Sequence, residues 1–226
     1  MAQPSILLTG FGPFPGAPAN PSAWLVEALA SEALASSACV YLDYTLHAEV
    51  LPTEWTAVSL RAPRLFHTLR PRLSLHFGLS KRARGFRIER FAHNRIMAQA
   101  DAAAALPSNN TVLAEGDDRL DSPLPASRLA THLRNQGLVA TPSRSAGGYL
   151  CNFLYYLSLD WAARQQPPCH AMFVHIPAEK AEGGPFDRAE ILRGASAILR
   201  FAIAFAEAGD QTAPVRAAPA AEQRAS

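Results

Sequence analysis

The sequence predicts an α/β fold, a three-layer αβα sandwich built around a mostly parallel, twisted sheet. Short apolar segments at 6–9, 73–79 and 171–176 have the length and composition of buried strands. Segments with apolar residues at helical spacing alternate with them along the chain. Such alternation is typical of a parallel sheet covered by helices on both faces. Ligands bind in these folds at the carboxyl ends of the strands.

The other elements follow from local patterns. Residues 40–46 are rich in aromatic and β-branched side chains, and 86–93 alternate apolar and polar positions like a half-buried strand. A further short strand is expected at 138–141. The expected helices cover 22–34, 53–70, 125–137, 151–166 and 185–209. Asn20 and Pro21 form a favourable helix start, Pro63 is expected to kink the second helix, and Gly137 to end the third.

Length and composition predict one domain. A chain of 226 residues suits a single core. Residues 97–124 are irregular and predict a long surface excursion, which is uncommon unless functional or disordered. From residue 210 the chain is Ala, Pro and polar, with nothing to bury. We therefore expect one α/β domain at 1–209 and a disordered tail at 210–226.

Charge and cysteine content exclude several classes of partner. The net charge of +2, from 21 basic and 19 acidic residues, predicts no binding to nucleic acid or to a membrane surface. Three cysteines argue against a disulfide framework and fit a reducing compartment. The start "MAQPSILLTG" lacks the pattern of a signal peptide, and no apolar run approaches a membrane span. We expect a cytoplasmic protein.

The opening loop, 7–16, reads "LLTGFGPFPG" and resembles a phosphate-binding loop only superficially. Its glycine spacing is one residue off the dinucleotide fingerprint. Pro13 and Pro15 remove backbone N–H groups that an anion cradle needs, and no Lys-Ser or Lys-Thr pair follows. Phe11 and Phe14 lie three residues apart on this stiffened backbone. They predict the walls of a flat apolar slot.

Cys151 is a candidate nucleophile. It follows the small-residue turn "AGG" and stands near the start of an apolar helix. A thiol at a helix N-terminus is favoured in its thiolate form. Cysteine is also among the most buried residue types, and from position alone a buried structural cysteine is the slightly more common outcome.

Cysteine chemistry needs a base and a group that orients the base. His175 ends the last expected strand, at the same edge of the sheet as the turn before Cys151. A lone histidine at a strand end is more often structural than catalytic. Glu89 is an acid in an otherwise apolar and basic strand. In isolation, an ion pair with Arg87 or Arg90 is the more common explanation of such a residue.

Two further kinds of site are poorly supported. A basic cluster at Lys81, Arg82, Arg84, Arg87 and Arg90 lacks a nucleic-acid-binding motif, so a solvated charged loop is the simpler interpretation. The chain has no Cys-x-x-Cys and no His-Glu-x-x-His, and its acids show no ligand spacing. We predict no metal site.

Taken together, these segments resemble pyroglutamyl peptidase I, the cysteine peptidase family C15. The resemblance spans roughly 6–205, and its blocks occur in the family's order. They are "LLTGFGPFPGAPANPS", "LPTEW", "FRIERFAHN", "SAGGYLCN" and "FVHIP". The nucleophile block "SAGGYLCN" is the most specific of them. The family has an αβα fold, like related phosphorylases and hydrolases.

The resemblance implies that Cys151 is the nucleophile, His175 the base and later the acid, and Glu89 the orienting carboxylate. It implies a thiol peptidase that removes an N-terminal pyroglutamyl residue from small peptides through a thioester acyl-enzyme, without metal or organic cofactor. The family is often dimeric or tetrameric, which makes a homodimer or homotetramer the expected assembly. The alternative is a catalytically silent member that binds pyroglutamate-like ligands.

The resemblance also assigns a binding pocket. Phe11 and Phe14 match the aromatic pair that sandwiches the lactam ring, Leu79 supplies backbone contacts to the lactam, and Leu150 lines the pocket. The chain departs from the family's usual pattern at Arg87, at Ser80-Lys81-Arg82, and at Gln99, which stands about where an arginine near the oxyanion is usual. We expect these departures to bear on rate and sequence preference rather than on reaction type.

Overall fold

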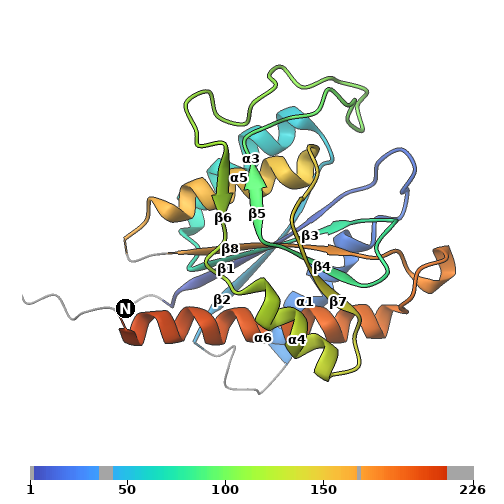
Figure 1. Ribbon diagram of the computed structural model, residues 1–226, viewed down its shortest axis with the longest axis vertical. Coiled ribbons are helices and arrows are strands. Elements are labelled where there is room, and N and C mark those ends of the chain that lie inside the picture. Colours follow the sequence, from blue (N-terminus) through green and yellow to red (C-terminus); the bar gives the residue numbers. More distant parts are fainter. Residues whose placement is uncertain (1–2, 36–42, 167–168, 213–226) are drawn as a thin grey trace, which may run out of the picture.

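The computed structural model describes residues 3–35, 43–166 and 169–212. Its middle layer is a six-stranded sheet with the order β2-β1-β3-β8-β4-β7 (Figure 1). The neighbouring strands run parallel except for β4, which is antiparallel to β8. The strands of this sheet are β1 (Ser5–Phe11), β2 (Thr45–Leu51), β3 (Leu73–Leu79), β4 (Phe86–Glu89), β7 (Ala140–Ser143) and β8 (His170–Ile176). The predicted mostly parallel α/β fold is confirmed.

Helices cover both faces of the sheet (Figure 1). One face carries α1 (Pro21–Ala35), α4 (Ala126–Asn135) and α6 (Arg188–Thr212), and the other carries α3 (Trp55–Leu69) and α5 (Leu150–Ala163). A short 3-10 helix, η1 (Lys180–Glu182), follows β8. In the described part of the chain, no helix is long and apolar enough to cross a membrane.

The alternation of side chains along β1 divides the core in two. Ile6 and Leu8 pack against the helices of the first face, and Leu7 between them packs against α3 and α5. All three are fully buried. Successive residues of a strand point to opposite faces, so a strand buried on both sides reads as a continuous apolar run.

The glycines of the opening loop serve close packing. A Cβ at Gly10 would lie 2.1 Å from the carbonyl oxygen of Ser22, so only glycine lets the end of β1 approach the start of α1 this closely. Ser22 Oγ accepts a hydrogen bond from the backbone N–H of Phe11 at 3.0 Å. Asn20 caps α1 as expected, since its Oδ1 accepts from the N–H of Ser22 at 3.2 Å.

The second strand lies later in the chain than predicted. The sequence places it at 40–46, whereas β2 pairs in register with β1 from Thr45 to Leu51. Asp43 lies in a turn, and residues 40–42 lie outside the described part. β2 is an edge strand with partly exposed side chains, so it tolerates polar residues such as His47 and Glu49. Local β-propensity therefore placed this strand about five residues too early in the chain.

The single strand predicted at 86–93 is wrong. The chain forms β4 in the central sheet, and then β5 (Phe91–His93), which pairs with β6 (Arg119–Asp121) in a separate two-stranded sheet. Arg90 is the point of division. Its N–H donates to the carbonyl of Ser143 at 3.0 Å, while its carbonyl accepts from Ser122 at 2.9 Å. Alternating polarity continues across this residue, so the pattern does not reveal the change of sheet.

The remaining boundaries differ by a few residues. The short strand expected at 138–141 is β7, beginning at Ala140, and α3 continues through Pro63 to Leu69. Gly137 has a φ of 76° after α4, as a helix-ending glycine does. The expected disordered tail at 210–226 begins within α6, which ends at Thr212, and its remaining residues lie outside the described part.

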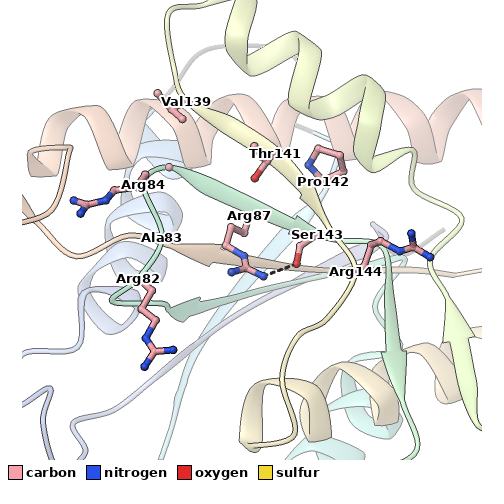
Figure 2. A pocket seen from close by; sticks show the side chains of 10 residues that line it. Arg82, Ala83, Arg84, Arg87, Val139, Thr141, Pro142, Ser143 and Arg144 are labelled. Carbon is pink, nitrogen blue, oxygen red and sulfur yellow. Dashed lines mark hydrogen bonds between the residues drawn. The ribbon is translucent and has the colours of Figure 1, made fainter.

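At the outer edge of the sheet, β4 pairs with β7, and Arg87 lies opposite Thr141. Both residues line an open cavity at this edge (Figure 2).

Candidate active site

Cys151 is the second residue of α5. Tyr149 is the N-cap, and the turn before it contains Gly147 in the left-handed region, with a φ of 87°. The first N–H groups of a helix have no acceptor within the helix, so they are available to an anion at this point. The sulfur lies against β3, since a Cβ at Gly78 would be 2.9 Å from Cys151 Sγ. Gly78 therefore leaves the space that the thiol occupies.

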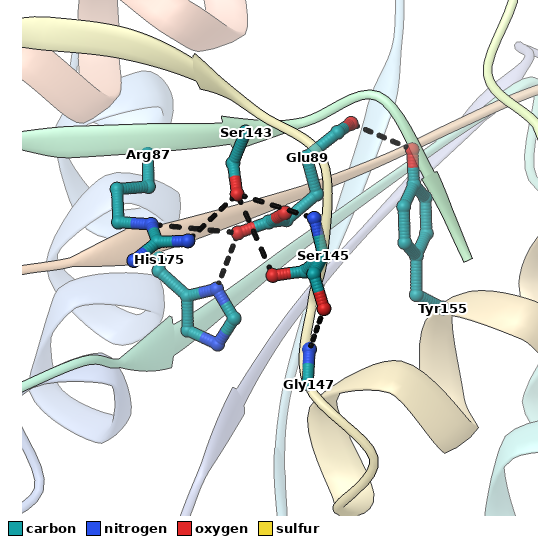
Figure 3. Close-up of polar contacts among 7 residues, drawn as sticks. All are labelled: Arg87, Glu89, Ser143, Ser145, Gly147, Tyr155 and His175. Carbon is teal, nitrogen blue, oxygen red and sulfur yellow. Dashed lines mark hydrogen bonds and ion pairs between the residues drawn. The ribbon is translucent and has the colours of Figure 1, made fainter. Parts of the chain in front are cut away.

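Glu89 and His175 come from the antiparallel pair β4 and β8. Glu89 Oε1 lies 2.8 Å from His175 Nδ1 (Figure 3). The Glu89 side chain is fully buried, and His175 is 8% exposed. Tyr155, which is also buried, donates from its hydroxyl to the carbonyl of Glu89 at 3.0 Å. Helix α5 thus carries the thiol and also braces the strand that holds the carboxylate.

The imidazole of His175 interacts with both neighbours. Burial alone would lower its pKa, but the charge and hydrogen bond of the Cys151 sulfur, together with the hydrogen bond and charge of Glu89, raise the pKa to about 9. An imidazolium is therefore stabilised between a sulfur and a carboxylate. The three predicted catalytic residues, scattered in sequence, meet at one edge of the sheet.

A small cavity opens beside Cys151. Its lining includes all four residues predicted for substrate binding, together with three residues that were not predicted there. Its lining consists of Phe11, Phe14, Leu79, Leu150 and Cys151, with Asn20, Thr53 and Tyr149 in addition. Phe11 and Leu150 are buried, whereas Phe14 and Leu79 are partly exposed. The walls are mainly apolar, and polar groups are few.

Asn20 and Thr53 were not predicted at the site. Both donate to the carbonyl of Gly12, Asn20 from Nδ2 at 3.1 Å and Thr53 from Oγ1 at 2.8 Å. They fix the loop that carries Phe11 and Phe14. The sequence marks Asn20 only as a helix cap. It places Thr53 inside the expected helix 53–70, whereas α3 begins at Trp55.

Residues 97–102 belong to the predicted surface excursion, and most of them are exposed, but backbone hydrogen bonds hold the segment against the site. The N–H of Met97 donates to the carbonyl of Gly148 at 2.7 Å, and Trp55 Nε1 donates to the carbonyl of Gln99 at 3.0 Å. The N–H of Ala102 donates to the carbonyl of Thr53 at 2.9 Å. The segment therefore crosses the N-termini of both α3 and α5. The Gln99 side chain is exposed.

Asn152, next to the thiol, is a further residue to which the sequence analysis gave no role of its own. Its buried side chain accepts from the N–H of His93 at 2.9 Å and donates to the carbonyls of His93 at 2.8 Å and Arg95 at 3.1 Å. These bonds tie the first turn of α5 to β5. Asparagine after a cysteine has no distinctive pattern, so only the fold reveals this role.

One further histidine, His76, makes its side-chain hydrogen bonds away from this cluster. His76 is fully buried on β3, with Nδ1 2.7 Å from Thr9 Oγ1 and Nε2 2.8 Å from Ser158 Oγ. Burial lowers its pKa to about 3, so the ring is neutral. Within the described ranges, no group of three or more His, Cys, Asp and Glu side chains is arranged to hold a metal ion.

A thiol at a helix start, an imidazole at the carboxyl end of β8 and a buried carboxylate on the neighbouring strand β4 are the arrangement of a cysteine hydrolase. Comparison with known proteins narrows this class. The family model described as pyroglutamyl peptidase matches residues 4–181. The chain belongs to the pyroglutamyl peptidase family.

Individual relatives agree with this assignment. The chain is 30% identical over 203 residues to human pyroglutamyl-peptidase 1, covering 88% of this chain and 90% of that protein. It is 31% identical over 173 residues to the pyrrolidone-carboxylate peptidase of Oceanobacillus iheyensis, covering 76% of this chain and 83% of the relative.

Solved structures show the same fold. Pyroglutamyl peptidase I of Bacillus amyloliquefaciens matches with a TM-score of 0.78 at 24% identity, over 89% of this chain and 97% of that one. The pyrrolidone carboxyl peptidase of Fervidobacterium islandicum matches with a TM-score of 0.78 at 26% identity, over 87% and 97%.

Proposed function

We propose that this protein removes an N-terminal pyroglutamyl residue from peptides, with Cys151 as nucleophile, His175 as proton carrier and Glu89 as the carboxylate that orients His175. The observation that carries the proposal is a chain of contacts from the Cys151 sulfur through the His175 ring to Glu89. In this chain His175 Nδ1 lies 2.8 Å from Glu89 Oε1. These contacts lie beside an apolar cavity at the sheet edge.

The reaction begins when the Cys151 thiolate attacks the carbonyl that joins pyroglutamate to the next residue. The backbone N–H of Cys151, in the first turn of α5, donates to the oxyanion in this proposal. His175 protonates the leaving amine and then takes a proton from water, which hydrolyses the thioester. Glu89 stabilises the imidazolium that is present before the amine leaves and forms again when water gives up its proton, and it fixes which ring nitrogen faces the sulfur.

The cavity suits a flat, neutral lactam. Phe11 and Phe14 offer apolar surface to the two faces of the ring, and Leu79 and Leu150 close the pocket. A peptide with a free N-terminal amine would bring an unpaired ammonium into this apolar slot, which is costly. Selection for pyroglutamate over ordinary N-termini follows from that cost.

Location and assembly belong to the same proposal. The sparse, odd number of cysteines favours a reducing, cytoplasmic location for a thiol enzyme. We propose a homodimer or homotetramer as the assembly, which light scattering of the purified protein would measure directly.

The test is hydrolysis of pyroglutamyl aminomethylcoumarin. We expect turnover that iodoacetamide abolishes, and protection from iodoacetamide by a pyroglutamate analogue. Alanyl aminomethylcoumarin should not be cleaved. Binding of the analogue without any turnover would contradict the proposal and identify a silent binding protein instead.

A further inference from the structure

A second cavity, of about 400 Å³, lies at the β4–β7 edge of the sheet. We call it the arginine cavity, because its lining includes four arginines from two segments distant in sequence. They are Arg82, Arg84, Arg87 and Arg144. Arg87 lies at the centre, Arg82 and Arg84 lie on one side, and Arg144 lies on the other (Figure 2).

The lining carries four positive charges and no acidic residue. The whole chain has a net charge of only +2, so this concentration is local. In the described ranges, Arg82, Arg84 and Arg144 make no ion pair, and all three are exposed. Four guanidinium groups around a hollow, three of them without an ion-pair partner, favour the binding of an anion, carboxylates especially.

Arg87 connects the arginine cavity to the catalytic residues. It lies directly opposite His175 in the pairing of β4 with β8. One of its terminal nitrogens donates to Ser143 Oγ at 2.8 Å, and its Nε is 4.0 Å from Glu89 Oε1 (Figure 3). Its side chain is only 40% exposed. The cavity therefore begins next to the group that would protonate the leaving amine.

The strand order gives the direction of a bound peptide. The apolar cavity for the pyroglutamyl ring has walls from β1 and β3, the proton carrier stands on β8, and the arginine cavity lies over β4 and β7. These positions follow one another across the sheet. A substrate with its ring in the first cavity and its scissile bond at His175 would extend its leaving portion over β4 toward β7.

We propose that the arginine cavity binds a carboxylate on the leaving portion of the peptide and makes the protein selective for acidic substrates. This inference rests on the proposed peptidase function. From β8 to β7 is two strand spacings, about 10 Å. An extended chain covers that distance with about three residues. The carboxylate would therefore be an acidic side chain at the third residue after the scissile bond, or the C-terminus of a peptide of that length.

The experiment compares kcat/KM for pyroglutamyl peptides that differ only in that carboxylate. One pair carries Glu or Gln at the third residue after the scissile bond, with amidated C-termini. Another pair carries neutral side chains and ends there in a free carboxylate or an amide. We expect about a five- to tenfold preference for the member with the carboxylate in at least one pair, and this preference should shrink as salt is added. The responding pair identifies the source of the carboxylate.

The double variant Arg84→Gln and Arg144→Gln should bring the preference to about one. The double variant Arg193→Gln and Arg200→Gln serves as the control, because it removes two charges as well, from exposed positions on α6 outside both cavities. This control should keep the preference. Equal kcat/KM for both members of each pair in the wild-type protein would overturn the inference, as would a preference that survives the double variant.

Failure of the proposed function would look different. In that case pyroglutamyl aminomethylcoumarin, which has no carboxylate on its leaving group, would not be cleaved at all. Cleavage of this substrate together with equal rates on all four peptides would leave the peptidase in place and remove only the arginine cavity from its specificity.

Discussion

Gly78 shows how one residue on a strand can determine the position of the nucleophile. The space that a side chain would fill at this position is taken by the sulfur of Cys151 and the ring of Phe173, each within 3 Å of an added Cβ. Nothing in the segment 73–79 marks this glycine, because its role depends on a cysteine contributed by a helix far along the chain.

Replacing Gly78 with alanine should displace the thiol. Misplacement of a reacting atom by about 1 Å can cost roughly a hundredfold in rate. We expect a fall of about that size in kcat for pyroglutamyl aminomethylcoumarin, with a smaller change in KM. Gly12→Ala is a matched comparison, since its added Cβ would make an ordinary contact at 3.6 Å from the carbonyl of Leu51. A Gly78→Ala protein as active as Gly12→Ala would contradict this account.

The His175 ring offers a spectroscopic test. Its pKa is raised to about 9, with Cys151 as the largest raising influence and Glu89 the next. NMR titration should show the ring protonated well above its ordinary value of 6.5. Cys151→Ala and Glu89→Gln should each lower the pKa, because each removes a group that favours the charged ring while the burial that disfavours it remains. An unchanged pKa in both variants would exclude the contact chain as its cause.

Sequence patterns identified the candidate catalytic residues better than the residues that hold the site in place. Cys151 stands after a small-residue turn and His175 at a strand end, and both features are visible in the sequence. β7, the strand before that turn, runs antiparallel to β8, so the expected parallel topology does not by itself bring the two residues together. The roles of Asn152 and Asn20 at the site are hydrogen bonds to backbone groups of other segments. Bonds of that kind depend on tertiary placement and leave no local pattern. The catalytic roles themselves stay predictions.

Among the elements, helix α3 and the segment 97–102 stabilise each other. Asp101 is 4% exposed, and its Oδ2 accepts from the N–H of Trp55, the first residue of α3, at 2.8 Å. Its Oδ1 accepts from Ala103 and Ala105, each at 2.9 Å. A side chain distant in sequence thus supplies the N-terminal cap of the helix and folds its own loop.

Asp101→Ala should lower the free energy of unfolding by about 2 kcal/mol, because three backbone donors lose their acceptor. Urea denaturation measures this loss. Asp101→Asn keeps one acceptor oxygen and should lose less. The alanine variant should also become sensitive to proteolysis between 97 and 106. Equal stability of the wild-type and alanine proteins would show that Asp101 does not hold this segment.

Element types were more predictable than their pairing. The buried strands β1, β3 and β8 are continuous apolar runs, and their positions were predicted within two residues. The edge strand β2 and the division between β4 and β5 were not, since edge exposure and a change of sheet are decided by neighbours in space. The same holds for 97–102, whose backbone bonds to distant groups make an irregular segment part of the site.

The stability of the whole molecule depends on pH through His76, a titratable side chain that is fully buried in the core. Its folded-state pKa, lowered to about 3 by burial, is below the value of 6.5 that the unfolded chain would have. Below pH 6.5 the unfolded chain therefore binds a proton that the folded protein rejects until about pH 3. The contribution of His76 to stability is complete above pH 6.5 and falls as the pH decreases, by up to about 1.4 kcal/mol per pH unit.

His76→Asn should make the acid side of the stability curve less steep. Urea denaturation between pH 4.5 and 7.5 measures that slope for the variant and the wild type. His67→Asn, at an exposed position of α3, should leave the slope as it is. Identical slopes for wild type and His76→Asn would mean that the buried ring does not resist protonation.

We expect Cys151 to form the covalent bond to the pyroglutamyl group. Acid quenching during turnover of a pyroglutamyl ester, followed by peptide mapping by mass spectrometry, locates that bond most directly. We predict a pyroglutamyl thioester on the peptide containing Cys151, absent from Cys151→Ser and still present when the other described cysteine, Cys169, is replaced by serine. A pyroglutamyl group on another residue, or steady hydrolysis by Cys151→Ser, would contradict it.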